Sequence, residues 1–462
     1  MAEMKTQDPA LPPLGDEAFE MLKAEAETEW LDAILIEHPQ LARMMIMHSL
    51  LVLGERGSGK TALRHALVQK SATLPKNRPL VVVWTPDLPQ GNLSETEIVR
   101  AYMDQIIAAC AVALLQHIAK NYIVFNAAPL HLRETLCAIL QRYLPGDPEL
   151  RLYEIEGQVS AEGLAFAKDA LTRPPRSLLK ADASQQTIIR MLAECVRAIG
   201  LSRIWIVADQ LEEWFDLEMQ AMAESLHSLM KSLALFEIAG FEFKLIAPRE
   251  FEKYLMQPSA LTIRRMSGFP LEWDPEQLVL LVERRLAAAF GKREFPLKKL
   301  APGKSLLGYL SEYGGKFPRG WLELIRPLAQ AYLRREMQRP FTEQEFQELR
   351  QENPLPLRHD PHTGAFMLHY KPLKLTEQPL KLLSLLYQRR VCTRSELWYL
   401  ALREFDQVPH REGDKNWEEP SVWRGNFDTT LYRLRDQVEP NAKAPIYIVS
   451  ADHGKIVLKN AL

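Results

Sequence analysis

The chain has 462 residues, of which 47% are hydrophobic and 25% charged, and its formal net charge at pH 7 is −2. Single hydrophobic cores stop growing at roughly 250–300 residues, so this length predicts two or three domains. The near-neutral charge excludes a global basic field that would attract nucleic acid or membranes, and any such binding is expected to be local.

Targeting signals and cysteine usage favour a cytoplasmic protein. The N-terminus is acidic and Pro-rich, unlike a signal segment, and we expect no uninterrupted apolar run long enough to cross a membrane. The cysteines lack C-x-x-C pairs, which argues against a zinc site or a disulfide framework and fits a reducing cytosol. They are Cys110, Cys137, Cys195 and Cys392.

Residues 1–40 are predicted to be an N-terminal extension. Three prolines break any element within residues 1–14, and helical periodicity runs from Asp16 to Ile36. The mainly apolar run 46–53 comes next and is followed by the motif GERGSGKT.

That motif meets every fixed position of G-x-x-x-x-G-K-[ST] between a predicted strand and a predicted helix. Its glycines would let backbone N–H groups surround phosphate oxygens, Lys60 would reach the outer phosphates, and the Thr61 hydroxyl would bind Mg²⁺. The alternative is only a tight strand-to-helix turn. We expect ATP and Mg²⁺ to bind here, through Gly54, Glu55, Arg56, Gly57, Ser58, Gly59, Lys60, Thr61 and Ala62.

Four further apolar runs predict an α/β fold with an open parallel sheet. They cover residues 80–84, 204–208, 243–247 and 269–273, and helical segments separate them. The gap between the first two is too long for one crossover, so we expect a helical insertion at about residues 90–200 between two strands of one sheet. The core domain is predicted over residues 41–274.

The run 204–208 ends in Asp209, where a carboxylate at the edge of the sheet would face Mg²⁺ and its waters. Many P-loop ATPases carry a water-activating Glu directly after this acid, but here Gln210 follows. Either Glu212 or Glu213 activates the water, or hydrolysis is slow and the protein works as a nucleotide-held switch.

Residues 40–345 resemble the AAA+ and STAND families of P-loop ATPases, particularly the origin-recognition-like branch. The resemblance rests on the P-loop, on the strand that ends in Asp209, and on the run YGGKFPR at residues 313–319. It implies a helical lid over residues 275–345, in which Arg319 senses the γ-phosphate; the alternative is a surface arginine that caps a helix.

The same resemblance implies an ATP-dependent homo-oligomer. Arg264 and Arg265 lie where such oligomers present an arginine finger to the neighbouring subunit, although a solvated basic pair is the simpler interpretation. The predicted strand 243–247 ends at Ala247 and is followed by Pro248 and Arg249, where these families often carry a polar sensor residue; the first sensor role is therefore left unassigned.

After a linker at 346–357, residues 358–462 resemble the OmpR/PhoB-type winged helix of bacterial response regulators. A hairpin at 360–370 precedes a first helix that opens near Leu375, and Thr393 and Glu396 form a capping box for a second helix. A third helix is predicted to begin near Asn426, and residues 446–458 form the hairpin that resembles the wing.

The third helix carries the predicted DNA contacts. Phe427, Leu431, Leu434 and Val438 share one face, and the helical wheel leaves hydroxyl, aromatic and guanidinium groups exposed, which suit phosphate and base-edge contacts. From residue 371 onward the chain has 15 Lys+Arg and 12 Asp+Glu, a net charge of only +3, so a protein-binding winged helix stays an alternative. The predicted DNA-binding residues are Thr429, Thr430, Tyr432, Arg433 and Lys455.

Residues 403–423 form a connection between the second and third helices that is longer than this fold requires. It holds Trp417 and Trp423, which either bind a partner or belong to the local core. Together these features predict a slowly hydrolysing, ATP-switched regulator of DNA binding. One alternative is an ATPase adaptor that binds proteins through its winged helix and helical insertion. A less favoured alternative is a P-loop kinase, for which the sequence shows no binding site for an acceptor substrate.

Overall fold

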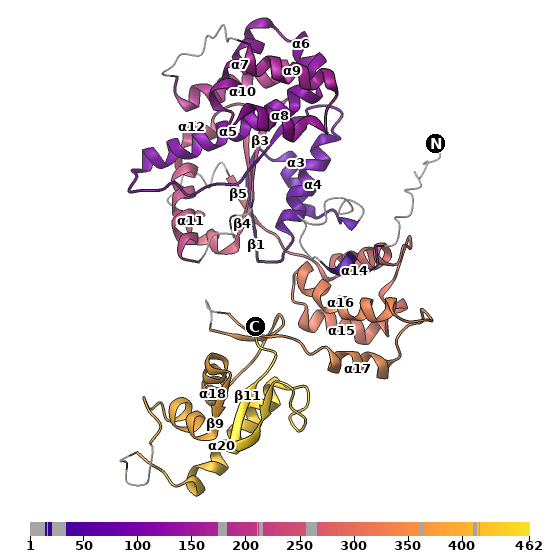
Figure 1. The fold of residues 1–462 in the computed structure, drawn as a ribbon, viewed down its shortest axis with the longest axis vertical. Helices are drawn as coiled ribbons and strands as arrows, with labels where there is room; N and C mark the ends of the chain where they lie inside the picture. Colours follow the sequence, from indigo (N-terminus) through magenta and orange to yellow (C-terminus); the bar gives the residue numbers. More distant parts are fainter. Residues whose placement is uncertain are drawn as a thin grey trace. The chain divides into compact units, whose positions relative to one another are not determined.

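The structure of the chain is a computed structural model that describes residues 14–15, 17–20, 34–173, 183–209, 211, 216–255, 266–360, 364–409, 414 and 416–462. The chain divides into two compact units, each shown with its own elements in Figure 1. One unit is Lys23–Gln277, and the other combines Met1–Leu22 with Leu278–Leu462.

The first unit is built on a five-stranded sheet in which every pairing is parallel, with the order β2-β3-β4-β1-β5. The parallel α/β core predicted from the apolar runs is therefore confirmed. The strands are β1 (Ser49–Gly54), β2 (Pro79–Trp84), β3 (Arg203–Ala208), β4 (Phe241–Pro248) and β5 (Met266–Pro270).

The predicted bounds of the last strand are wrong. The strand occupies Met266–Pro270 in place of 269–273, because pairing with β1 places Ser49 opposite Met266 and Leu53 opposite Pro270. The chain then leaves the sheet, and Trp273 follows the strand.

Both faces of this sheet are covered, which explains why its strands are continuous apolar runs. Alternate residues of β1 point to opposite faces: Leu51 and Leu53 join one buried cluster, and Leu50 and Val52 join another. The second cluster includes residues of α3 (Pro39–Ile46) and α4 (Lys60–Ala72). Outside the insertion between β2 and β3, this unit also has α11 (Asp216–Lys231), α12 (Leu233–Phe236), the short 3-10 turn η2 (Arg249–Phe251) and α13 (Glu252–Leu255).

The chain between β2 and β3 is helical, as predicted. A capping box between Ser94 and Glu97 starts its longest helix. The insertion comprises α5 (Glu95–Lys120), α6 (Tyr122–Ala127), α7 (Leu130–Tyr143), α8 (Pro148–Glu156), α9 (Ala161–Thr172) and α10 (Gln185–Ala198).

Helix α5 corrects the expectation about apolar runs, because by length and composition it could cross a membrane. It instead packs against β2, α7, α9, α10 and α11 and contributes buried residues such as Ile106 and Leu114 to the core. These contacts are those of a core helix and are compatible with a soluble protein.

The second unit begins with a helical region that matches the predicted lid segments. Its helices are α1 (Glu17–Glu20), α14 (Pro275–Ala289), which reaches it from the first unit, α15 (Gly303–Tyr313), α16 (Pro318–Leu333) and α17 (Glu343–Glu352), with the short turn η4 (Leu297–Lys299). The predicted linker at 346–357 is wrong over its first half. A capping box between Thr342 and Glu345 starts α17, and Phe346 is buried.

The C-terminal part of this unit combines two small antiparallel sheets with helices. One sheet has the order β6-β7-β8 and the other β10-β11-β9. Its elements are β6 (Leu357–His359), β7 (Phe366–Leu368), β8 (Lys371–Pro372), α18 (Glu377–Arg389), β9 (Val391–Thr393), α19 (Arg394–Glu396), the π-helical turn η5 (Leu397–Leu402), α20 (Pro420–Val438), β10 (Ile448–Ser450), the 3-10 turn η6 (Asp452–Gly454) and β11 (Lys455–Leu458).

Two features of this part differ from expectation or decide between alternatives. The third helix, α20, begins at Pro420, before the predicted start at Asn426, because proline is favoured in the first turn of a helix. Trp423 belongs to the local core: it is 3% exposed and stacks on Trp398 with ring centroids 5.6 Å apart.

Candidate functional site

The candidate site lies where the chain leaves β1 at the carboxyl edge of the sheet. From β1 the chain continues through α4 to β2, which lies beyond β4 and β3, whereas from β4 it returns past β1 to β5. The connections after β1 and β4 thus run toward opposite edge strands of the sheet, β2 and β5. Such a switch in direction opens a crevice at the carboxyl ends of parallel strands, the usual ligand position in open α/β sheets.

The loop between β1 and α4 has the backbone that its glycines predict. Gly57 and Gly59 have φ of 86° and 88°, in the left-handed region that glycine adopts without strain. At Gly54 an added Cβ would collide with the Oγ of Ser58, so a larger residue would require that side chain to shift. Ser58 is fully buried and its hydroxyl has no hydrogen-bond partner among the described residues.

Lys60 is the first residue of α4 and folds back over this loop. Its side chain is buried at 4% exposure, and Nζ donates to the carbonyl oxygens of Gly54 at 3.0 Å and Glu55 at 2.9 Å. The ammonium group and the helix N-terminus thus place positive charge at one point, which is what an anion requires.

Asp209 lies directly after β3, as predicted, and only 2% of its side chain is exposed. Arg64 of α4 faces it, with Nε 3.3 Å from Oδ2. The sequence analysis missed Arg64. Its position four residues after Lys60 was the available signal, because residues at that spacing share one face of a helix.

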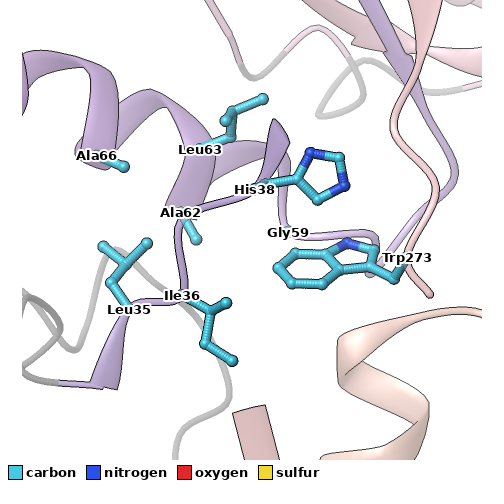
Figure 2. Close-up of a pocket in the computed structure, with 8 residues that line it drawn as sticks. All are labelled: Leu35, Ile36, His38, Gly59, Ala62, Leu63, Ala66 and Trp273. Carbon is cyan, nitrogen blue, oxygen red and sulfur yellow. The ribbon is translucent and has the colours of Figure 1, made fainter. Parts of the chain in front are cut away.

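A small pocket adjoins Gly59 at the start of α4 (Figure 2). The rings of His38 and Trp273 lie on one side of it, with centroids 4.8 Å apart, and apolar side chains complete the lining. The volume of about 20 Å³ is close to that of one water molecule. The lining residues are Leu35, Ile36, His38, Gly59, Ala62, Leu63, Ala66 and Trp273.

Hydrogen bonds fix both rings of this pocket. Trp273 Nε1 donates to the carbonyl oxygen of Ser58 at 2.7 Å, and the His38 Nε2 bonds the carbonyl oxygen of Glu272 at 2.7 Å. His38 Nδ1 accepts from the Gln40 amide and caps α3, so the imidazole is neutral in this arrangement. Burial lowers the pKa of His38, against the raising effects of the Glu272 carbonyl and of Asp274. The sequence analysis singled out neither ring.

The predicted catalytic residues are not tested by the structure. Glu212, Glu213, Arg264 and Arg265 all lie outside the described residues. Arg319 is the second residue of α16 and belongs to the second unit, whereas the phosphate loop belongs to the first.

The predicted DNA-contact residues differ in their exposure. Thr429, Tyr432 and Arg433 are exposed on α20, and Lys455 is exposed at the first position of β11. The expectation that Thr430 is exposed is wrong, because its side chain is 5% exposed and its hydroxyl donates to the carbonyl oxygen of Asn426 at 2.9 Å. That internal bond satisfies the hydroxyl and allows threonine on the packed side of the helix.

Within the described residues no group of three or more His, Cys, Asp or Glu side chains is arranged to hold a metal ion by itself. No protein-family model matches the chain, and no curated protein matches it. The site geometry therefore carries the functional argument.

Proposed function

We propose that the chain is an ATP-binding, slowly hydrolysing regulator whose nucleotide state controls DNA binding by the C-terminal module 358–462. The observation that carries nucleotide binding is the phosphate loop itself. Two left-handed glycines, the buried ammonium of Lys60 and the N-terminus of α4 converge at the switch point of a parallel sheet.

The sheet order supports the same reading. The strand that ends in Asp209 is separated from β1 by one strand, β4. This order is in keeping with the resemblance to AAA+ and STAND ATPases.

Thr61 and Asp209 are the residues that would hold Mg²⁺, which when bound neutralises phosphate charge. The present volume of the pocket beside Gly59 is too small for an adenine ring. The pocket would therefore receive the base only after Trp273 moves.

Contacts inside the second unit support coupling between the helix that carries Arg319 and the C-terminal module. His369, 2% exposed, bonds the carbonyl oxygen of Gly320 through Nε2 at 3.0 Å. A Cβ at Gly320 would lie 2.7 Å from the ring of Tyr370, so the two segments are in direct contact. Arg319 precedes Gly320 on the same helix and is therefore one residue from this contact.

DNA binding is supported by the exposed hydroxyl, phenol and guanidinium of Thr429, Tyr432 and Arg433 on one helix. A specific observation also favours the protein-adaptor alternative: α20 exposes Asp428 and Asp436 beside them, and Asp428 pairs with Arg394 at 3.2 Å. The insertion adds exposed apolar side chains, including Tyr153 at 74% and Leu150 at 58%.

The test compares the full chain with its Lys60→Ala variant in titrations with fluorescent ATP and ADP. Loss of a charge-assisted phosphate contact is expected to weaken binding roughly 10- to 100-fold. Lys70→Ala, on the same helix, is the control and should bind normally. Equal affinities in natively melting proteins would reject the nucleotide site.

The output is tested with the same protein by measuring mass and DNA retention in ADP and in a non-hydrolysable ATP analogue. DNA binding should weaken steeply with salt, because phosphate contacts release counterions. An absence of DNA retention at low salt in either nucleotide would shift the assignment to the adaptor.

A further inference from the structure

Arg64 connects the helix of the phosphate loop to the acid at the end of β3. It follows Thr61 by three positions and Lys60 by four, so the three side chains start from one face of α4. Its guanidinium reaches across to Asp209, with Nε 3.3 Å from Oδ2. The guanidinium of Arg64 thus lies against Asp209, one of the two residues assigned to Mg²⁺. Arg64 also starts from the same face of α4 as Thr61, the other assigned residue.

The ion pair is well shielded. The side chain of Asp209 is 2% exposed and that of Arg64 is 20% exposed. A carboxylate at this depth is stabilised by a cationic neighbour, and arginine remains charged at every pH at which proteins are folded. Mg²⁺ gives up its waters reluctantly and demands near-octahedral geometry, so it competes poorly for a carboxylate that a fixed cation already faces.

We propose that Arg64 sets the Mg²⁺ requirement of nucleotide binding, by occupying the Asp209 carboxylate that the metal needs. This inference rests on the proposed nucleotide function. Arg64 acts as a positioning residue through its ion pair with Asp209, and Lys60 supplies the positive charge for the phosphates without metal. The wild-type protein is therefore expected to bind ADP in EDTA, and to respond to Mg²⁺ only at high concentrations of the metal.

Two other roles for Arg64 give different results. A direct phosphate ligand would raise nucleotide affinity equally with and without Mg²⁺. A purely structural clamp between α4 and β3 would affect the melting temperature but leave the metal response unchanged.

The experiment measures binding of fluorescent ADP to the full chain in EDTA and across a series of Mg²⁺ concentrations. Arg64→Met keeps an unbranched, flexible side chain and removes its charge. It should lower the half-saturating Mg²⁺ concentration by roughly tenfold or more, the factor that corresponds to about 1.4 kcal/mol. Lys70→Met is the matched control: its ammonium lies on the same helix but pairs with the exposed Glu37 at 2.6 Å. It should follow the wild-type series.

An unchanged Mg²⁺ series in Arg64→Met would overturn the proposal, as would an equal loss of affinity with and without the metal. If Arg64→Met does not fold, Arg64→Lys decides: a more compact, strongly hydrated charge should leave the half-saturating concentration below the wild-type value. Failure of the wild-type protein to bind ADP under any condition would overturn the nucleotide function as well.

Discussion

The indole Nε1 of Trp273 donates a hydrogen bond of 2.7 Å to the carbonyl oxygen of Ser58, 215 residues away in the sequence. This bond links the segment after β5 to the middle of the phosphate loop. The same ring lines the pocket beside Gly59, so one side chain both supports the loop and limits the space next to it (Figure 2).

Trp273→Phe should separate these two roles, because it keeps an aromatic ring, although a smaller one, and removes the N–H donor. We expect the free energy of unfolding to fall by about 0.5–1.5 kcal/mol, the net value of one hydrogen bond. Nucleotide affinity should fall as the loop loses its support. Trp273→Ala should open the pocket further. A Phe variant with wild-type stability and affinity would show that the bond does not hold the loop.

Glu242 should be essential for stability, because it is the shared partner of several donors on the sheet. Its carboxylate, 6% exposed, lies 2.9 Å from Arg203, 3.3 Å from Lys244 and 2.8 Å from the indole of Trp205. Burial is the main cause that lowers the pKa of Lys244, to about 8, and Glu242 opposes it.

Glu242→Gln leaves the buried Lys244 without its counter-charge, and we expect a loss of about 3–5 kcal/mol in chemical unfolding. Glu250→Gln, at an exposed position close to the end of β4, is the control and should change stability little. A loss no larger than the control's would mean that the carbonyl oxygens of Met47 and His48, which also accept from Lys244, are sufficient.

Acid should destabilise the helical insertion through His117 of α5. Burial, together with Arg78, lowers its pKa from 6.5 to about 4. The unfolded chain therefore takes up this proton first as the pH falls. The contribution of neutral His117 to the free energy of unfolding is fully present above pH 6.5 and is lost as the pH falls toward 4. The loss amounts to at most roughly 3 kcal/mol.

Unfolding curves between pH 7 and 4 check this slope, and His117→Gln should flatten it. His131→Gln changes an exposed histidine and should not. An identical slope in His117→Gln and the wild type would place the sensitivity elsewhere.

Arg433 and Leu434 are adjacent on α20, but their substitutions should affect different properties: DNA binding for Arg433 and stability for Leu434. Leu434 is fully buried, so Leu434→Ala should cost about 2–5 kcal/mol by leaving a cavity. Arg433 is exposed, so Arg433→Ala should leave stability unchanged and weaken DNA binding.

A phosphate contact by Arg433 would appear as a similar loss on all sequences and a salt slope smaller by about one unit. A contact to guanine would remove about 1–3 kcal/mol on the preferred site alone. Lys443→Ala removes a positive charge outside α20 and is the control; equal effects of both variants would reject a specific contact.

The sequence by itself determined the strand–loop–helix unit and the parallel sheet, because these depend on neighbours along the chain. Gly57 and Gly59 are required by their backbone conformation, and Lys60 begins a helix directly after them. Continuous apolar runs likewise predict strands that are covered on both faces. The capping box at Thr393 was also legible from four residues.

Tertiary structure decided which distant side chains contact the phosphate loop and α4. Arg64 meets Asp209, and Trp273 meets Ser58, because strands far apart in sequence end at one edge of the sheet. No local pattern specifies such pairs. The bounds of β5 were set by its register with β1, and Thr430 is buried because it lies on the side of α20 that packs against the rest of its unit. Local periodicity assigns elements, whereas long-range packing assigns the partners of individual side chains.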